Sequence, residues 1–166
     1  IKIRIIAALL MTFLVLGTSA NVFAHCQIPC GIYGDKMRFD MLMEHITTIK
    51  KSMNEITKLS EEETPDYNQI VRWVNNKDQH ADFVMDIALQ YFLAQRIKPV
   101  SDANDKAAHE KYANQLETVH LIIVHSMKAK QTTKLEHVEK LQQLVEKFYK
   151  LYFDKDMEQH LNEHGK

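Results

Sequence analysis

The chain has 166 residues, of which 45% are hydrophobic and 26% are charged, a size and composition suited to one globular domain with a substantial core. Its 21 basic and 22 acidic side chains nearly cancel, so the charge gives no reason to expect binding to nucleic acid or to an acidic membrane surface. Only two cysteines are present, Cys26 and Cys30, and they lie four positions apart.

Residues 1–24 have the pattern of a secretory signal peptide. Two basic side chains precede an apolar run over residues 5–16, and Val22 and Ala24 fit the minus-three and minus-one positions that a signal peptidase reads. The run is shorter than the roughly 20 apolar residues of a membrane span. We therefore expect cleavage after Ala24 and export to the periplasm or the medium, with no membrane attachment afterwards.

The sequence after this leader predicts helices, because apolar residues recur at steps of three and four. The first helix is expected to carry the apolar stripe Phe39, Leu42, Ile46, Ile49, Met53 and Ile56. A second is expected over about residues 66–96, with Thr64 as its N-cap and Pro65 at the first helical position.

Two more helices follow a break at Pro99. Ser101 or Asp102 can cap the third, whose predicted apolar side carries Tyr112, Leu116, Val119, Ile123 and Met127. The stripe of the fourth is Leu135, Val138, Leu141, Leu144, Val145, Phe148 and Leu151. The sequence thus predicts an all-α fold, an antiparallel four-helix bundle over residues 37–166, with an irregular metal-binding hook over residues 25–36.

The hook would gain its chemistry from the predicted cleavage. A free amine on His25 would close a five-membered chelate ring with the Cys26 amide nitrogen, and that nitrogen would close a second ring with the Cys26 sulfur. The Cys30 thiolate would complete a plane, and the His25 imidazole would lie in an axial position. Planar nitrogen donors favour copper(II) or nickel(II), whereas two thiolates alone suit zinc or copper(I). Pro29 and Gly31 disfavour a helix across this segment.

Two other functions fit parts of this pattern. One is an exported helical protein that captures copper or another metal without turnover, and the other is a thiol redox protein that uses Cys26 and Cys30. Three residues rather than two separate the cysteines, which disfavours the redox function, and neither alternative explains the histidine after the cleavage site. Glu117 and His120 form one Glu-x-x-His step, but a di-iron bundle needs two, so we expect both residues to be at the surface or loosely paired.

The segment His-Cys-x-x-Pro-Cys-Gly-x-Tyr over residues 25–33 resembles the nickel-hook motif of nickel superoxide dismutases. The resemblance implies that His25, Cys26 and Cys30 hold one nickel ion per chain, His25 through both its amine and its imidazole. It implies that Tyr33 lines the access site for superoxide. It also implies an oxidoreductase that converts superoxide to dioxygen and hydrogen peroxide by Ni(III)/Ni(II) cycling, assembled as a homohexamer.

The resemblance also bears on residues outside the hook. A second family tyrosine would match Tyr91, and the acid that steadies the axial histidine would match Asp40 or Glu44. The arginine that partners this acid has no clear equivalent, since Asn75, Asn76 and Lys77 occupy the expected stretch.

Overall fold

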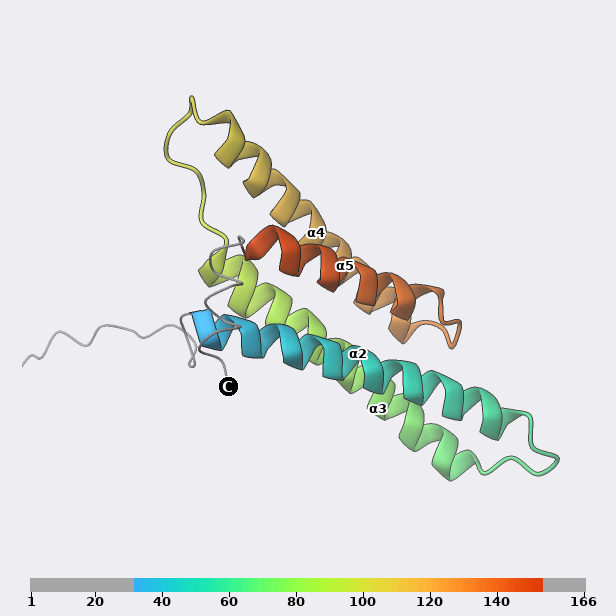
Figure 1. The fold of residues 1–166 in the computed structure, drawn as a ribbon. Coiled ribbons are helices and arrows are strands. Elements are labelled where there is room, and N and C mark those ends of the chain that lie inside the picture. Colours follow the sequence, from blue (N-terminus) through green and yellow to red (C-terminus); the bar gives the residue numbers. More distant parts are fainter. Residues whose placement is uncertain (1–31, 154–166) are drawn as a thin grey trace, which may run out of the picture.

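The structure is a computed structural model in which residues 32–153 are described (Figure 1). This part of the chain holds four α-helices and one π-helix and no strand. In chain order they are α2 (Ile32–Ser60), α3 (Tyr67–Asp86), the π-helix η1 (Ile87–Arg96), α4 (Lys106–Lys130) and α5 (Glu136–Tyr152). None of the described helices is both long enough and apolar enough to span a bilayer.

The helices form an antiparallel bundle, as the sequence predicts. Helices α2 and α3 make one hairpin and α4 and α5 a second, while α3 also packs on α4 and α5 returns to α2. The beginning of α2, the end of η1 and the end of α5 therefore lie at the same end of the bundle (Figure 1). Helix α2 begins at Ile32, so residues 32–36, which the sequence analysis assigns to the hook, are helical.

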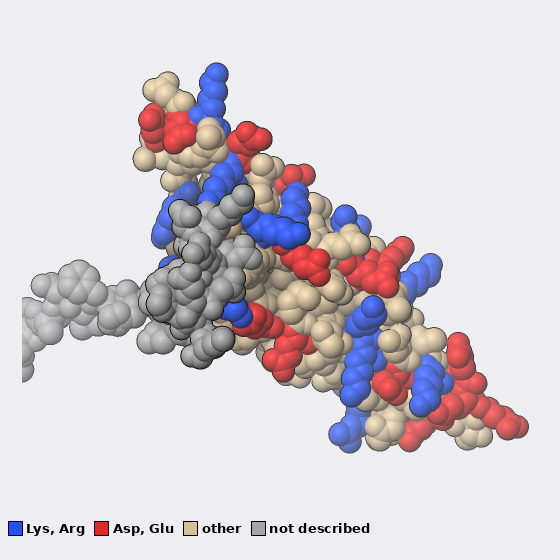
Figure 2. Space-filling model, in the orientation of Figure 1, with Lys and Arg blue, Asp and Glu red and all other residues tan. Residues whose placement is uncertain are grey.

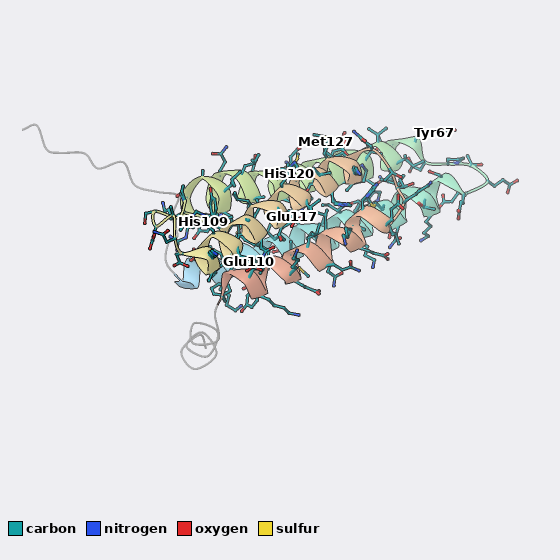
Figure 3. All side chains as sticks on the ribbon, turned by 90° about the horizontal axis from the view of Figure 1, so that it is seen from above. Tyr67, His109, Glu110, Glu117, His120 and Met127 are labelled. Carbon is teal, nitrogen blue, oxygen red and sulfur yellow. The ribbon has the colours of Figure 1, made fainter. Side chains whose placement is uncertain are left out.

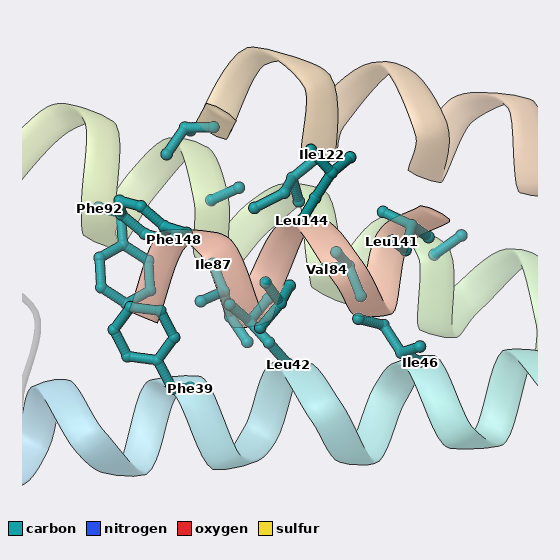
Figure 4. Close-up of a cluster of buried hydrophobic side chains, with 14 of the residues drawn as sticks. Phe39, Leu42, Ile46, Val84, Ile87, Phe92, Ile122, Leu141, Leu144 and Phe148 are labelled. Carbon is teal, nitrogen blue, oxygen red and sulfur yellow. The ribbon is translucent and has the colours of Figure 1, made fainter. Parts of the chain in front are cut away.

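The core confirms the predicted stripe of α2. Its six members are all buried, and Figure 4 shows Phe39, Leu42 and Ile46 facing side chains from α3, η1, α4 and α5. The Phe39 ring packs 4.7 Å from Phe92 and 5.2 Å from Phe148, measured between centroids. Such tilted aromatic pairs stabilise a core beyond the burial of their area.

Helix α4 keeps most of its predicted stripe at the core: Val119 is buried, and Tyr112, Leu116 and Ile123 pack against the core while partly exposed. Other buried positions lie outside that stripe. Val119, Ile122, Ser126 and Ala129 are buried, whereas Met127 is 46% exposed. Ser126 does not read as apolar, yet its hydroxyl donates to the Ile122 carbonyl at 2.8 Å, so it can be buried without an unpaired polar group. The predicted stripe contains only large side chains and therefore omits the small buried residues Ser126 and Ala129.

Two helix starts also differ from the prediction. Asp66, not Thr64, caps α3 by accepting from the Gln69 amide at 3.1 Å. Asp105 caps α4 by accepting from the Ala108 amide at 2.9 Å, because Asp102 instead accepts from Asn104 and closes a preceding turn.

Lys77 is buried in α3 and reaches the C-terminal end of α4. Its Nζ donates to the carbonyls of Ala129 and Lys130 at 3.0 and 2.6 Å and to Asp78 at 2.7 Å. A cation is favourable at this end of a helix, where the last carbonyls lack intrahelical partners. The ammonium group therefore ties the two hairpins together.

Candidate functional site

A polar cluster fills the end of the bundle where α2 begins. The buried carboxylate of Asp35 accepts a hydrogen bond at Oδ1 from the Tyr91 hydroxyl, at 2.6 Å. Its Oδ2 accepts from the Arg96 guanidinium at 2.5 Å and from the Tyr152 hydroxyl at 2.8 Å. Arg96 also donates from Nε to the Tyr152 oxygen at 3.2 Å. We call these four residues the Asp35 cluster.

The Asp35 cluster depends on the π-helix. Tyr91 and Arg96 are five residues apart, a separation that would place them about 140° apart around an α-helix of 3.6 residues per turn. In η1 the hydrogen bonds run to the fifth residue back, as from the Ile97 amide to the Phe92 carbonyl at 2.9 Å. Residues five apart then lie on one side, so both side chains reach Asp35. Short π-helical segments are often found at functional sites.

The cluster keeps its phenols protonated at neutral pH. Burial raises the pKa of Tyr91, and the hydrogen bond to Asp35 and the negative charge of that carboxylate raise it further. Burial also raises the pKa of Tyr152, to about 12, with the Arg96 hydrogen bond opposing and the Asp35 hydrogen bond adding to the shift. Both hydroxyls thus remain hydrogen-bond donors.

Two guanidinium groups lie against the Tyr91 ring. The Arg38 carbon Cζ is 4.9 Å from the ring centroid and that of Arg96 is 5.9 Å from it. Cations at this distance from an aromatic face are attracted to the ring. The Tyr91 side chain is therefore fixed both at its hydroxyl and through its ring.

The predicted site residues fall into two groups. His25, Cys26 and Cys30 lie outside the described residues, and Tyr33 is the second residue of α2, with a side chain that is likewise outside the description. Tyr91 lies in the Asp35 cluster, at the same end of the bundle as the start of α2.

The two acids considered from the sequence lie elsewhere. Asp40 is exposed and pairs with Lys36 at 2.8 Å, and Glu44 is exposed. The structure instead pairs a buried acid, Asp35, with a partly buried arginine, Arg96. The sequence signal that could have found it is an acid in the first helical turn after the hook, two residues beyond Tyr33.

The Glu-x-x-His step of the sequence lies on the surface. Glu117 and His120 are both exposed along α4 (Figure 3), as the sequence analysis expects. Within residues 32–153, no three side chains of His, Cys, Asp or Glu come together as a metal site. On the face shown in Figure 2, basic and acidic side chains are intermixed over the helices.

Fold and site together define a helical-bundle protein with a buried acid, arginine and two tyrosines at the end from which the cysteine motif departs. The family model of nickel-containing superoxide dismutase matches residues 20–156, which is most of the chain. The chain therefore belongs to the nickel-containing superoxide dismutases. It is an oxidoreductase with a nickel cofactor and superoxide as its substrate. No curated protein and no solved structure matches it.

Proposed function

We propose that His25, Cys26 and Cys30 hold the nickel ion of this dismutase and that the Asp35 cluster supports them from the bundle. The observation that carries the proposal is the family match, which spans the hook segment together with every described helix. When bound, nickel supplies one-electron chemistry by alternating between Ni(III) and Ni(II). The residues around the ion determine which small molecules reach it and which groups hold protons near it.

The donor set fits nickel. An amine, an amide nitrogen and two thiolates are available from a chain that begins at His25, and such a set of nitrogen and sulfur donors suits a square-planar d-block ion. Binding requires loss of the thiol protons, so affinity for nickel should rise with pH.

Chain connectivity supports a link between hook and cluster. Cys30 is two residues before the start of α2, so its Cα can lie no more than about 7 Å from that of Ile32. Asp35 is in the first turn of the same helix and is bonded to η1 and α5. The cluster therefore fixes the helix end from which the hook extends.

Each described residue has a distinct part in this proposal. Asp35 anchors the helix end, Arg96 balances its charge, and Tyr91 holds a proton that it does not release near neutral pH. The protons consumed when superoxide is reduced to peroxide would come from solvent, from Tyr33 or from a protonated ligand of the hook. Tyr33, at the start of α2, is proposed to line the approach of superoxide.

Export and assembly are further parts of the proposal. Residues 1–24 would be removed to expose the His25 amine, outside the cytoplasm.

A homohexamer needs contact surfaces, and Tyr67 and Val71, one turn apart on α3, are 72% and 57% exposed. Light scattering on the metal-loaded protein would measure the assembly, and a monomer would contradict the hexamer.

Replacing either thiolate tests the hook. In Cys26→Ser and Cys30→Ser the hard hydroxyl is a poor ligand, so we expect loss of nickel and of superoxide decay while helix content by circular dichroism is retained. Met127→Leu, an exposed change on α4, is the matched control and should keep both properties. Stoichiometric copper without turnover would favour metal capture, and full activity in the double serine variant would exclude the hook.

A further inference from the structure

Four histidines of the described chain form two pairs between neighbouring helices. The Nδ1 atoms of His45 in α2 and His80 in α3 are 3.0 Å apart. Those of His125 in α4 and His137 in α5 are 3.2 Å apart. In both pairs the nitrogens of the two rings point at each other across a helix–helix contact, so the two hairpins share one arrangement.

The separation fits two ligands of one metal ion. Imidazole nitrogens bind zinc at about 2.0–2.1 Å, and two such bonds meeting at about 90–110° place the nitrogens about 2.8–3.4 Å apart. Imidazole suits zinc, copper and nickel ions alike. A bound ion would replace the hydrogen bond between the two nitrogens, with each ring turned so that its Nδ1 lone pair faces the ion. Because the rings come from different helices, the ion would join α2 to α3.

We propose that His45 and His80 form a two-histidine site for a divalent late transition-metal ion, completed by water, that ties α2 to α3. The site is separate from the hook and does not depend on the proposed nickel ligands.

The surroundings of His45 and His80 favour this pair. The Phe83 ring lies 5.2 Å from the His45 ring and 5.6 Å from the His80 ring, which holds both imidazoles in place. His45 also lines a pocket of about 360 Å³ together with Met41 and Asp86. The pocket leaves room for water ligands. The Arg38 guanidinium lines it as well and opposes the Asp86 carboxylate, while the negative charge that acts on His45 is that of Glu44.

The second pair is a natural comparison within the same chain. Glu136 lies 3.5 Å from the Nε2 atom of His137, a carboxylate contact of the kind that supports metal-binding histidines. Lys128 and Lys140, however, place positive charge near His125. Repulsion between these charges and a cation should make this pair the weaker binder.

Zinc binding tests the proposal in a background without hook thiolates. The parent is the chain beginning at His25 with Cys26→Ser and Cys30→Ser, and the probe is ZnCl2, followed by calorimetry and by thermal unfolding. We expect His45→Gln and His80→Gln each to bind one zinc ion fewer than the parent and to lose most of the zinc-dependent rise in Tm. His120→Gln, which removes an exposed histidine of α4, should match the parent.

Two results would overturn the site. The first is equal zinc binding in the parent, His45→Gln and His80→Gln. The second is a loss of zinc only in His125→Gln. Either result would mean that His45 and His80 form only a hydrogen bond between neutral imidazoles. Ring-nitrogen NMR of the parent protein keeps the test independent of how the variants fold. The His45 and His80 signals should shift together on addition of ZnCl2, and unchanged signals would contradict the proposal. Nickel activity enters none of these measurements, so failure of the hook would be seen separately.

Discussion

At the scale of single residues, Asp35 carries the most connections. One buried carboxylate accepts hydrogen bonds from Tyr91, Arg96 and Tyr152, which belong to two other elements. A buried charge is costly unless it is paired and fully hydrogen-bonded, and here both oxygens are engaged. Asp35 therefore joins the start of α2 to η1 and to the end of α5.

Replacing this carboxylate should destabilise the bundle. Asp35→Asn keeps the shape of the side chain but removes the charge opposite Arg96, so we expect a loss of about 1–3 kcal/mol in the free energy of unfolding, measured with urea. Asp40→Asn is the matched control, because its pair with Lys36 is exposed and should change the free energy of unfolding by less than about 1 kcal/mol. Equal losses of unfolding free energy in the two variants would show that the Asp35 cluster stabilises the bundle no more than an exposed ion pair does.

Tyr91 separates support of the nickel site from stability of the fold. Tyr91→Phe removes one hydroxyl and leaves Asp35 Oδ1 without that donor. By analogy with residues that orient metal ligands, we expect superoxide decay to slow by about tenfold with nickel content and helix content retained. Met127→Leu, at an exposed residue of α4, should have wild-type activity. Unchanged decay in Tyr91→Phe would remove Tyr91 from the site.

At the scale of elements, the sequence predicts helices whose apolar residues recur at regular α-helical spacing. It does not predict the π-helix, where that spacing changes. The α2 stripe from Phe39 to Ile56 follows α-helical spacing throughout and was predicted in full. The π-helix was not, because Ile87, Ala88, Tyr91 and Phe92 still follow α-helical steps and only the five-residue step to Ile97 reveals the change.

Of the Asp35 cluster, only Tyr91 could be predicted from the sequence. Tyr91 could be matched through its local sequence, whereas Arg96 reaches Asp35 only because the π-helix turns it to that side. Tyr152 lies 117 positions from Asp35, and no local pattern relates two residues so distant in the chain.

The helix–helix contacts should weaken in acid. Burial, followed by the charge of His80, lowers the pKa of His45, with Glu44 opposing; burial, His137, Lys128 and Lys140 lower that of His125. Below about pH 6.5 the unfolded chain then binds more protons than the folded one, so stability falls as the pH falls through the depressed pKa values.

Urea unfolding of metal-free protein between pH 7.5 and 5 measures this effect. We expect His45→Gln to lose part of the pH dependence, because glutamine takes up no proton. His120→Gln should keep the dependence of the unchanged protein, since that imidazole is exposed. The same slope in both variants would mean that the contact between α2 and α3 does not oppose protonation.

At the scale of the whole molecule, the bundle brings three helix ends together at the Asp35 cluster. The start of α2, the end of η1 and the end of α5 meet there, and the family match runs through all of them. The long, closely packed helices provide a rigid base, and the cysteine motif enters that base through the first turn of α2. The Asp35 cluster thus lies at the end of the bundle where the chain enters α2.

The measurement that tests this account most directly is superoxide decay by two nickel-treated proteins that differ by one residue. The first begins at His25, and the second carries one alanine before it, so that the His25 nitrogen becomes an amide while Cys26, Cys30 and the imidazole are unchanged. We expect the second protein to lose most of its activity, with helix content and Tm little altered, because the amine donor has moved. Equal rates of superoxide decay in the two proteins would contradict a nickel site built on the His25 amine.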